Sequence, residues 1–164
     1  YCYRVASTVG LVCIEIYGYA DQSAREYAES WGVFMQLTNI LRDVAEDAER
    51  DRIYLPIDDL AKYGITEDDV KSGSALLEHP GWKPFVKEYI DRCHRYREKA
   101  FKLLPLLDRK SRYSPAAMAT FYKSILSKIE KLDGDVFSDR VQLSKAEKII
   151  FAAYVYVRYR FLAL

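Results

Sequence analysis

The chain has 164 residues, half of them hydrophobic and 30% charged, and its formal net charge is +1. This length supports one domain with its own core, and the low number of turn-forming residues, 7 glycines and 5 prolines, favours long helices over a fold of many strands. The basic residues are spread at helical spacing and do not form a dense run, which argues against a nucleic-acid-binding protein. We therefore expect a single all-α domain over residues 1–164.

The cysteines and the apolar runs indicate in which cellular compartment the protein resides. Cys2, Cys13 and Cys93 are odd in number and lack C-x-x-C spacing, so we expect neither a disulfide framework nor a zinc site. Reduced thiols are typical of the cytoplasm, and no secretory signal is visible. The longest uninterrupted apolar run, Ile149–Val157, has nine residues, far short of the ~20 that span a bilayer. We expect a cytoplasmic protein.

The first two predicted helices cover residues 1–18 and about 22–49. In the first, apolar side chains recur at helical spacing. Ala6, Ser7 and Gly10 are small enough for another helix or a ligand to approach closely. The second helix is longer and has an apolar back and a polar front.

Shorter and longer helices follow along the chain. After a loop at 50–57 we predict short helices at 58–63 and from Thr66, a long helix at 83–107 that Pro105 ends or kinks, a helix from Ser114 to 132, and a last helix that begins with a capping box at Ser144. The last helix is rich in aromatic residues. Peripheral contact with a membrane and burial inside the protein both explain that composition.

The polar front of the second helix carries acids and amides. On a helical wheel Gln36, Asn39, Asp43, Glu46 and Asp47 share one arc. Asp43 and Asp47 repel each other and have no basic residue four positions after them, whereas Glu46 has one. A hard dication such as Mg²⁺ would supply the missing charge, because it binds carboxylate, amide and phosphate oxygens. An acidic face turned to water explains the same pattern.

Two segments of the sequence resemble motifs of a known family. Residues 36–56, QLTNILRDVAEDAERDRIYLP, resemble the second aspartate-rich motif of the squalene/phytoene synthase family, and residues 1–10, YCYRVASTVG, resemble the motif that precedes it. The resemblance implies an isoprenoid-synthase-type helical bundle, of which this chain holds only the C-terminal helices. It also implies a prenyltransferase that condenses two prenyl diphosphates head to head with Mg²⁺. The family's first aspartate-rich motif, a D-x-x-x-D on an earlier helix, has no counterpart here.

The resemblance implies roles for the residues of the two motifs. Asn39, Asp43 and Asp47 would be the metal ligands, Gln36 would point into the same cavity, and Arg42 would bind substrate. The segment 1–10 would supply Tyr1 near the diphosphate, with Val5, Ala6 and Val9 as the lining of a hydrocarbon tunnel.

The C-terminal helices would complete the site. The resemblance implies that Tyr122, Arg140 and Lys148 approach it, with Arg140 and Lys148 holding phosphate oxygens.

The motifs leave the substrate open. The segments Ile14–Tyr19, Leu104-Pro105 and Asp108-Arg109 look most like bacterial presqualene diphosphate synthases of hopanoid biosynthesis, which favours conversion of farnesyl diphosphate to presqualene diphosphate or squalene. NADPH would be needed only for squalene. The alternatives are a phytoene synthase that acts on geranylgeranyl diphosphate, a catalytically inactive truncated module, and a complex in which another chain supplies the missing N-terminal half.

Overall fold

The structure is a computed structural model that describes residues 1–161, with side chains through Tyr159. Within this range it has no strand, and an isolated bridge pairs Tyr19 with Leu107. The elements in chain order are η1 (Tyr3–Ser7, a π-helical turn), α1 (Thr8–Tyr17), α2 (Ala24–Arg42), α3 (Val44–Glu49), α4 (Ile57–Ala61), α5 (Glu67–Lys71), η2 (Gly73–Glu78, 3₁₀), α6 (Trp82–Ala100), η3 (Phe101–Leu106, 3₁₀), α7 (Tyr113–Lys131) and α8 (Lys145–Phe161). The expected all-α fold is confirmed.

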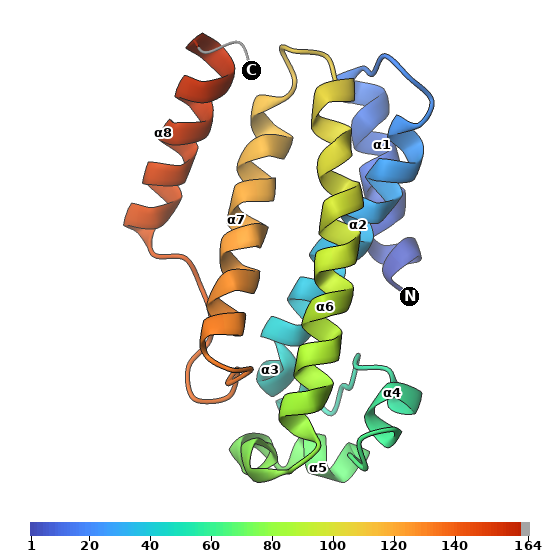
Figure 1. Ribbon diagram of the computed structural model, residues 1–164, viewed down its shortest axis with the longest axis vertical. Helices are drawn as coiled ribbons and strands as arrows, with labels where there is room; N and C mark the ends of the chain where they lie inside the picture. The colour runs from blue at the N-terminus through green and yellow to red at the C-terminus, as the bar shows by residue number, and fades with distance from the viewer. Residues whose placement is uncertain (162–164) are drawn as a thin grey trace.

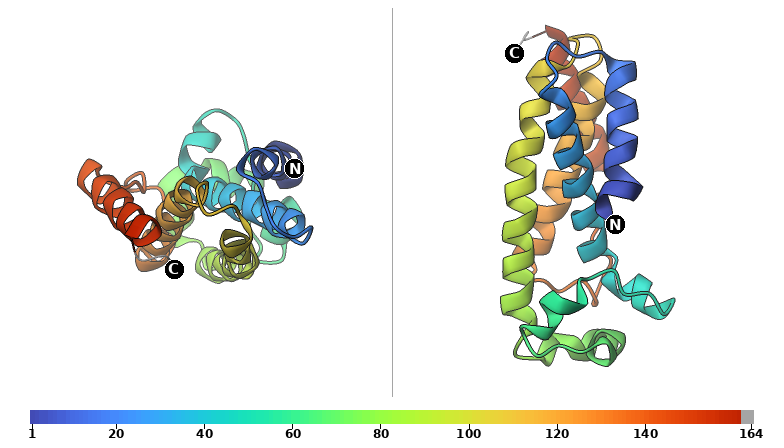
Figure 2. Two further views of the ribbon diagram at one scale, coloured as in Figure 1. Left: turned by 90° about the horizontal axis from the view of Figure 1, so that it is seen from above. Right: turned by 90° about the vertical axis from the view of Figure 1, so that its right-hand side faces the viewer.

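Helix α2 is the centre of the bundle. It packs against α1, α6 and α7, and Figure 1 shows these helices with α8 at the outer edge beside α7 and the short helices α4 and α5 as a foot below α6. Seen from above, α1 and α8 lie at opposite ends of the arrangement (Figure 2). The C-terminal end of α2, where the second motif begins, therefore lies in the lower part of the bundle, above the short helices α4 and α5.

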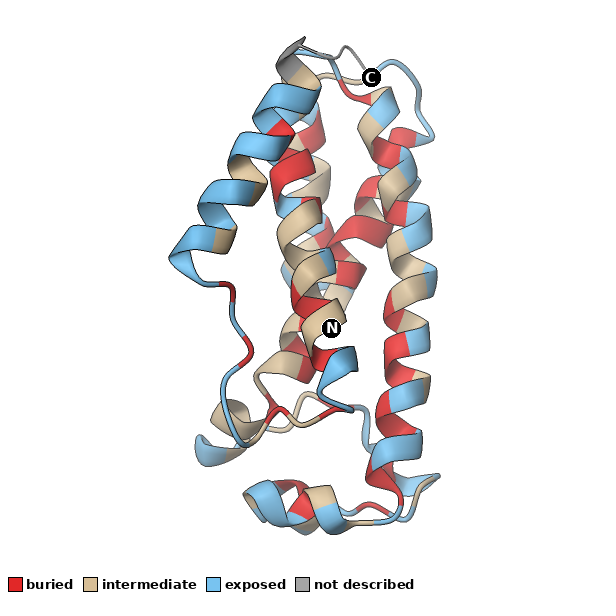
Figure 3. Ribbon diagram, turned by 60° about the vertical axis from the view of Figure 1, so that its left-hand side comes forward, coloured by how far each residue is buried: buried red, intermediate tan, exposed pale blue. Residues whose placement is uncertain are grey.

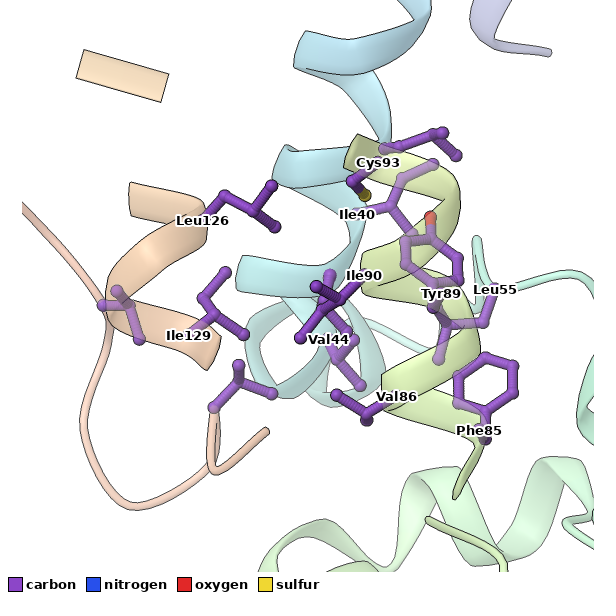
Figure 4. Close-up of a cluster of buried hydrophobic side chains, with 14 of the residues drawn as sticks. Ile40, Val44, Leu55, Phe85, Val86, Tyr89, Ile90, Cys93, Leu126 and Ile129 are labelled. Atoms are coloured by element: carbon purple, nitrogen blue, oxygen red, sulfur yellow. The ribbon is translucent and has the colours of Figure 1, made fainter. Parts of the chain in front are cut away.

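The main core joins α2 and α3 to α6 and α7. Figure 4 shows Ile40 and Val44 facing Tyr89 and Ile90 of α6, with Leu126 of α7 closing the far side. All five side chains are buried, and full burial of one aliphatic side chain stabilises a fold by roughly 1.5–3 kcal/mol. This packing fixes the apolar back of α2 and leaves its polar front free for the site.

The helix predicted at 22–49 is interrupted at Asp43. This residue has φ −101° and ψ 13° and separates α2 from α3. The hydrogen bonds continue through the break, because the Asp43 N–H donates to the Asn39 carbonyl and the Asp47 N–H to the Asp43 carbonyl. Arg42 and Asp43 form a two-pronged ion pair. Neighbouring side chains on a regular helix do not face each other, so we attribute the change of backbone angles to this pair.

Other predicted boundaries shift by small amounts. The helix expected to reach residue 107 ends at Ala100 and continues as η3, because Pro105 has no N–H for an α-helical hydrogen bond. The predicted caps at Thr66 and Ser144 are confirmed: the Asp69 N–H donates to the Thr66 hydroxyl and the Glu147 N–H to the Ser144 hydroxyl.

Helix α8 is the most exposed of the long helices. It packs along α7, where Val155 is buried and Phe151 meets Phe121. Its other sides are largely exposed in Figure 3, including Ile149 and Ile150. Among the described residues, none of the helices has the length and apolar character that crossing a membrane requires.

Candidate functional site

An apolar groove runs between α1, α2 and the start of α7. Its volume is about 230 Å³, and it ends in polar side chains, Gln36 and Asn39. Val5, Ala6 and Val9 line it, so the structure brings the three predicted tunnel residues together with two residues of the second motif. The other lining residues are Gly10, Cys13, Ile14, Tyr17, Ala28, Trp31, Gly32, Met35, Leu103, Pro115 and Met118.

Small residues let the first helical segment pack closely against α2 along this groove. A Cβ atom on Gly32 would lie 2.5 Å from the Ser7 Cα, and one on Gly10 would lie 3.0 Å from the Ala28 carbonyl oxygen. The Ser7 hydroxyl donates to the Glu29 carbonyl, 2.8 Å away. Residue numbers therefore rise along α1 as they fall along α2, so the two helices are antiparallel.

This antiparallel register places the two ends of the groove. Val5 lies toward the end that holds Asn39, and Tyr17 lies toward the opposite end. The groove residues of α2 run from Ala28 to Asn39, a length of about 16 Å along a helix. A ligand with a polar head at Asn39 would extend its apolar part toward Tyr17.

Asn39 has an unsatisfied polar atom at the polar end. Its side-chain oxygen is buried and has no hydrogen-bond partner. A buried carbonyl oxygen without a partner costs about 1–3 kcal/mol, so this position is suited to a ligand that provides positive charge. Within the described residues no three of His, Cys, Asp and Glu gather as a metal cluster. The amide of Asn39 and the carboxylates of Asp43 and Asp47, which follow it at steps of four residues, nevertheless offer oxygen donors of the kind that Mg²⁺ takes together with waters and phosphate oxygens.

Asp43 is held by two arginines. Arg42 donates from Nε and Nη2 at 2.8 and 2.6 Å, and Arg140 donates from Nη2 at 3.2 Å. Burial by itself would raise the pKa of Asp43, but the hydrogen bonds and charges of Arg42 and Arg140 outweigh it and hold the pKa below its usual value. Asp43 is therefore an anion in the folded protein. No basic residue lies four positions after Asp43, yet Asp43 has two basic partners: Arg42, the residue just before it, and Arg140, 97 positions later.

Glu46 also differs from the expected pairing. Its carboxylate contacts the Arg140 Nε at 3.1 Å, and no ion pair with Arg50 is present in the part of the chain that the structure describes. Arg140 thus bridges Glu46 and Asp43 from the loop between α7 and α8. Helical spacing could not reveal this partner.

Asp47 lies in a different electrostatic environment. Burial and the negative charge of Asp43 raise its pKa, and the charges of Arg50 and Arg52 only partly offset them. Tyr1 is close enough for the Asp47 charge to contribute to a raised Tyr1 pKa, whose largest cause is burial, followed by Tyr54. The rings of Tyr1 and Tyr54 are stacked with centroids 5.1 Å apart. Tyr1 therefore lies within electrostatic range of Asp47, but together with Tyr54 it lines a pocket other than the apolar groove.

The three predicted residues from the C-terminal part of the chain differ in how close they lie to the motif. Tyr122 of α7 packs edge-on against Phe34 of α2 and contributes, after the larger effect of Asp43, to the raised pKa of Arg42. Lys148 is exposed on the first turn of α8, a helix that packs along α7. The structure therefore brings Tyr122 and Arg140 to the motif and leaves Lys148 at the surface of the described chain.

Several residues of the site were missed by the sequence reasoning. Trp31, Met35 and Met118 line the groove, and Tyr54 stacks on Tyr1. Trp31 and Met35 carry a signal in the sequence, because they fall on the same side of α2 as Gln36 and Asn39 at helical spacing. Met118 and Tyr54 come from other elements, so only the folded chain places them here.

Similarity to known proteins shows the family of this chain. The family model described as squalene/phytoene synthase matches residues 1–147. The chain is 40% identical over 164 residues to phytoene synthase 2, chloroplastic, of Zea mays, a match that covers 96% of this chain and 40% of the relative. It is 41% identical over 156 residues to phytoene synthase, chloroplastic, of Narcissus pseudonarcissus, covering 91% of this chain and 36% of the relative.

A solved structure extends the comparison to the fold. A dehydrosqualene synthase crystallised in complex with ligand superposes with a TM-score of 0.81 at 28% identity, covering 94% of this chain and 53% of that one. The chain thus spans about two fifths of these curated relatives and about half of the solved structure. The matched residues include both motifs, the groove and Arg140, and on this evidence the chain belongs to the squalene/phytoene synthase family.

Proposed function

We propose that this chain forms the part of a prenyltransferase that holds a metal-bound diphosphate and its prenyl chain, and that the whole enzyme condenses two prenyl diphosphates head to head. The observation that carries the proposal is the unpartnered Asn39 oxygen at the polar end of an apolar groove. A diphosphate with a long apolar chain has the same division into a charged head and an apolar tail. Membership of the family supports this reaction class.

The chain's own residues would divide the work along the groove. Asn39, Asp43 and Asp47 would hold Mg²⁺, which when bound neutralises the charge of the departing diphosphate. Arg42 keeps Asp43 ionised and so ready to bind a cation. Arg140, half exposed beside Asp43, would donate hydrogen bonds to phosphate oxygens.

The apolar part of the groove would orient the prenyl chain and keep water away. Val5 and Val9 on one wall and Met35 on the other offer no hydrogen bonds to water. Trp31 adds an aromatic side chain to the same wall, and aromatic faces stabilise a nearby cation by roughly 0.5–2 kcal/mol. Exclusion of water would protect a reactive carbocation from capture until the second substrate adds.

Two chain lengths are candidates for the substrate. The relatives that match at 40% and 41% identity are named phytoene synthases, which favours geranylgeranyl diphosphate and a phytoene-like product. The bacterial presqualene-type segments at residues 14–19, 104–105 and 108–109 favour farnesyl diphosphate. We retain both candidates, because the apolar lining of the groove suits a hydrocarbon chain and does not by itself select its length.

The test is product identification with the full-length protein. Incubation with Mg²⁺ and either farnesyl or geranylgeranyl diphosphate, with and without NADPH, should give a head-to-head product from one of the two. Asp43→Asn and Asp47→Asn should abolish turnover while the protein stays folded, and Asp91→Asn, on an exposed part of α6, serves as the matched control. If turnover in both motif variants equals that of the control, the metal assignment is wrong. If the folded wild-type protein forms no product from either substrate, the chain belongs to an inactive module.

A further inference from the structure

Arg140 is held by two carboxylates that use different parts of its guanidinium group. Its Nε lies 3.1 Å from a Glu46 oxygen, and its Nη2 lies 3.2 Å from an Asp43 oxygen. The Arg140 side chain is 51% exposed, whereas those of Asp43 and Glu46 are 20% and 34% exposed. The guanidinium is therefore accessible from the solvent side while its inner edge is fixed.

The loop that carries Arg140 is anchored on both sides of this residue. Val136 and Val141 are buried in the main core. Asp135 accepts hydrogen bonds from the N–H groups of Phe137 and Ser138, and the Trp82 indole N–H donates to the Gly134 carbonyl. With its backbone held in this way, Arg140 can change partners by rotating its side chain, without moving the loop.

The two contacts of Arg140 have different consequences when a cation arrives. The Asp43 oxygen that Arg140 contacts already accepts a shorter hydrogen bond from Arg42, 2.8 Å against 3.2 Å. A divalent cation on Asp43 would repel Arg140 and weaken the longer bond. The contact with Glu46 would persist, because it uses Nε, and the Nη groups would then be free to donate to another acceptor.

We propose that Glu46 is a positioning residue: it holds Arg140 beside the motif so that, when a divalent cation occupies Asp43, the guanidinium passes from Asp43 to an oxygen of the bound diphosphate. This inference rests on the proposed function, since it assumes a diphosphate at the Asp43 end of the groove. In this role Glu46 would bind neither the metal nor the diphosphate, since its carboxylate is paired with Arg140. Its effect on diphosphate binding passes through Arg140.

A double-mutant cycle on the full-length protein tests this role. The wild type, Glu46→Gln, Arg140→Gln and the double variant are compared for binding of inorganic diphosphate in the presence of Mn²⁺, followed by calorimetry and by the electron paramagnetic resonance signal of free Mn²⁺. Glu46→Gln should weaken diphosphate binding about two- to five-fold, the range expected for one partly exposed ion pair. In the Arg140→Gln background the same change should have little effect. Arg25→Gln, which removes an exposed arginine paired with Glu15, is the matched control.

The outcomes separate positioning from other roles. Rescue of diphosphate binding by Glu46→Asp would support the proposal, because a shorter carboxylate can still accept from Arg140. Equal weakening by Glu46→Gln in both backgrounds would overturn it, and so would tighter diphosphate binding in Glu46→Gln. These measurements require no turnover. Failure to form product with diphosphate binding intact would therefore count against the proposed reaction and leave the role of Glu46 standing.

Discussion

The two aspartates of the motif should have opposite effects on stability. In the metal-free protein at neutral pH, Asp43→Asn removes an anion that two arginines stabilise, whereas Asp47→Asn removes an anion that burial and Asp43 destabilise. Charge-assisted hydrogen bonds contribute about 1.5–3 kcal/mol when buried, so we expect Asp43→Asn to cost about 2 kcal/mol at its partly buried site. Relief of like-charge repulsion gives about 0.2–0.5 kcal/mol, which sets the expected gain for Asp47→Asn.

The pH dependence follows from the directions of the two pKa shifts. The folded-state pKa of Asp43 is lowered, so its stabilising effect is present above the unfolded value of about 3.9 and is lost as the pH falls through the folded-state pKa. The folded-state pKa of Asp47 is raised, so its contribution favours the fold below that unfolded value and is lost as the pH rises through the folded-state pKa. The advantage of Asp47→Asn should therefore be larger at pH 7 than at pH 4.

Thermal and urea unfolding in EDTA at pH 7 and pH 4 measure both effects. For a chain of this size about 1 kcal/mol corresponds to ~2–4 °C in melting temperature, so Asp43→Asn should melt about 4–8 °C below the wild type at pH 7. Asp47→Asn should melt at or slightly above it. Asp91→Asn, on the exposed side of α6, is the control. If both motif variants lose stability by equal amounts, the electrostatic difference drawn between the two aspartates is incorrect.

Three further predictions concern packing around the site. Gly32→Ala should destabilise the protein by about 1–3 kcal/mol in urea unfolding, because its Cβ would lie 2.5 Å from the Ser7 backbone, whereas unchanged stability would show that α1 can move away from α2. Leu126→Ala should cost about 2–5 kcal/mol in the same assay, since Leu126 is fully buried in the main core; a loss below 1 kcal/mol would contradict that packing. Tyr54→Ala should lower the Tyr1 pKa in an NMR titration that follows the Tyr1 ring, because Tyr54 contributes to its raised value after burial, and Tyr54→Phe should retain the stacked ring and lower it less; the same Tyr1 pKa in the wild type and both variants would refute the contact.

Local sequence was sufficient for the helices and for the family. The caps at Thr66 and Ser144 were readable because the groups that bond are three residues apart. The shared side of Gln36 and Asn39 on α2 was readable because helical periodicity alone places side chains on one side of a helix. The two motifs are contiguous strings, so their family resemblance needed no knowledge of the fold, and the family match over residues 1–147 confirms it.

Only the tertiary structure decided which charges meet. Arg140 reaches Asp43 across 97 residues, and the helical rule that assigned Arg50 to Glu46 considers neighbours on one helix only. The break at Asp43 likewise follows from side-chain pairing, which propensity does not encode. Met118 joins the groove because α7 packs beside α2.

The sequence by itself determined which residues carry charge, amide and apolar groups and which of them share a helix face, since these depend on positions a few residues apart. The folded chain determined their partners, because contacts between distant segments depend on how whole helices pack.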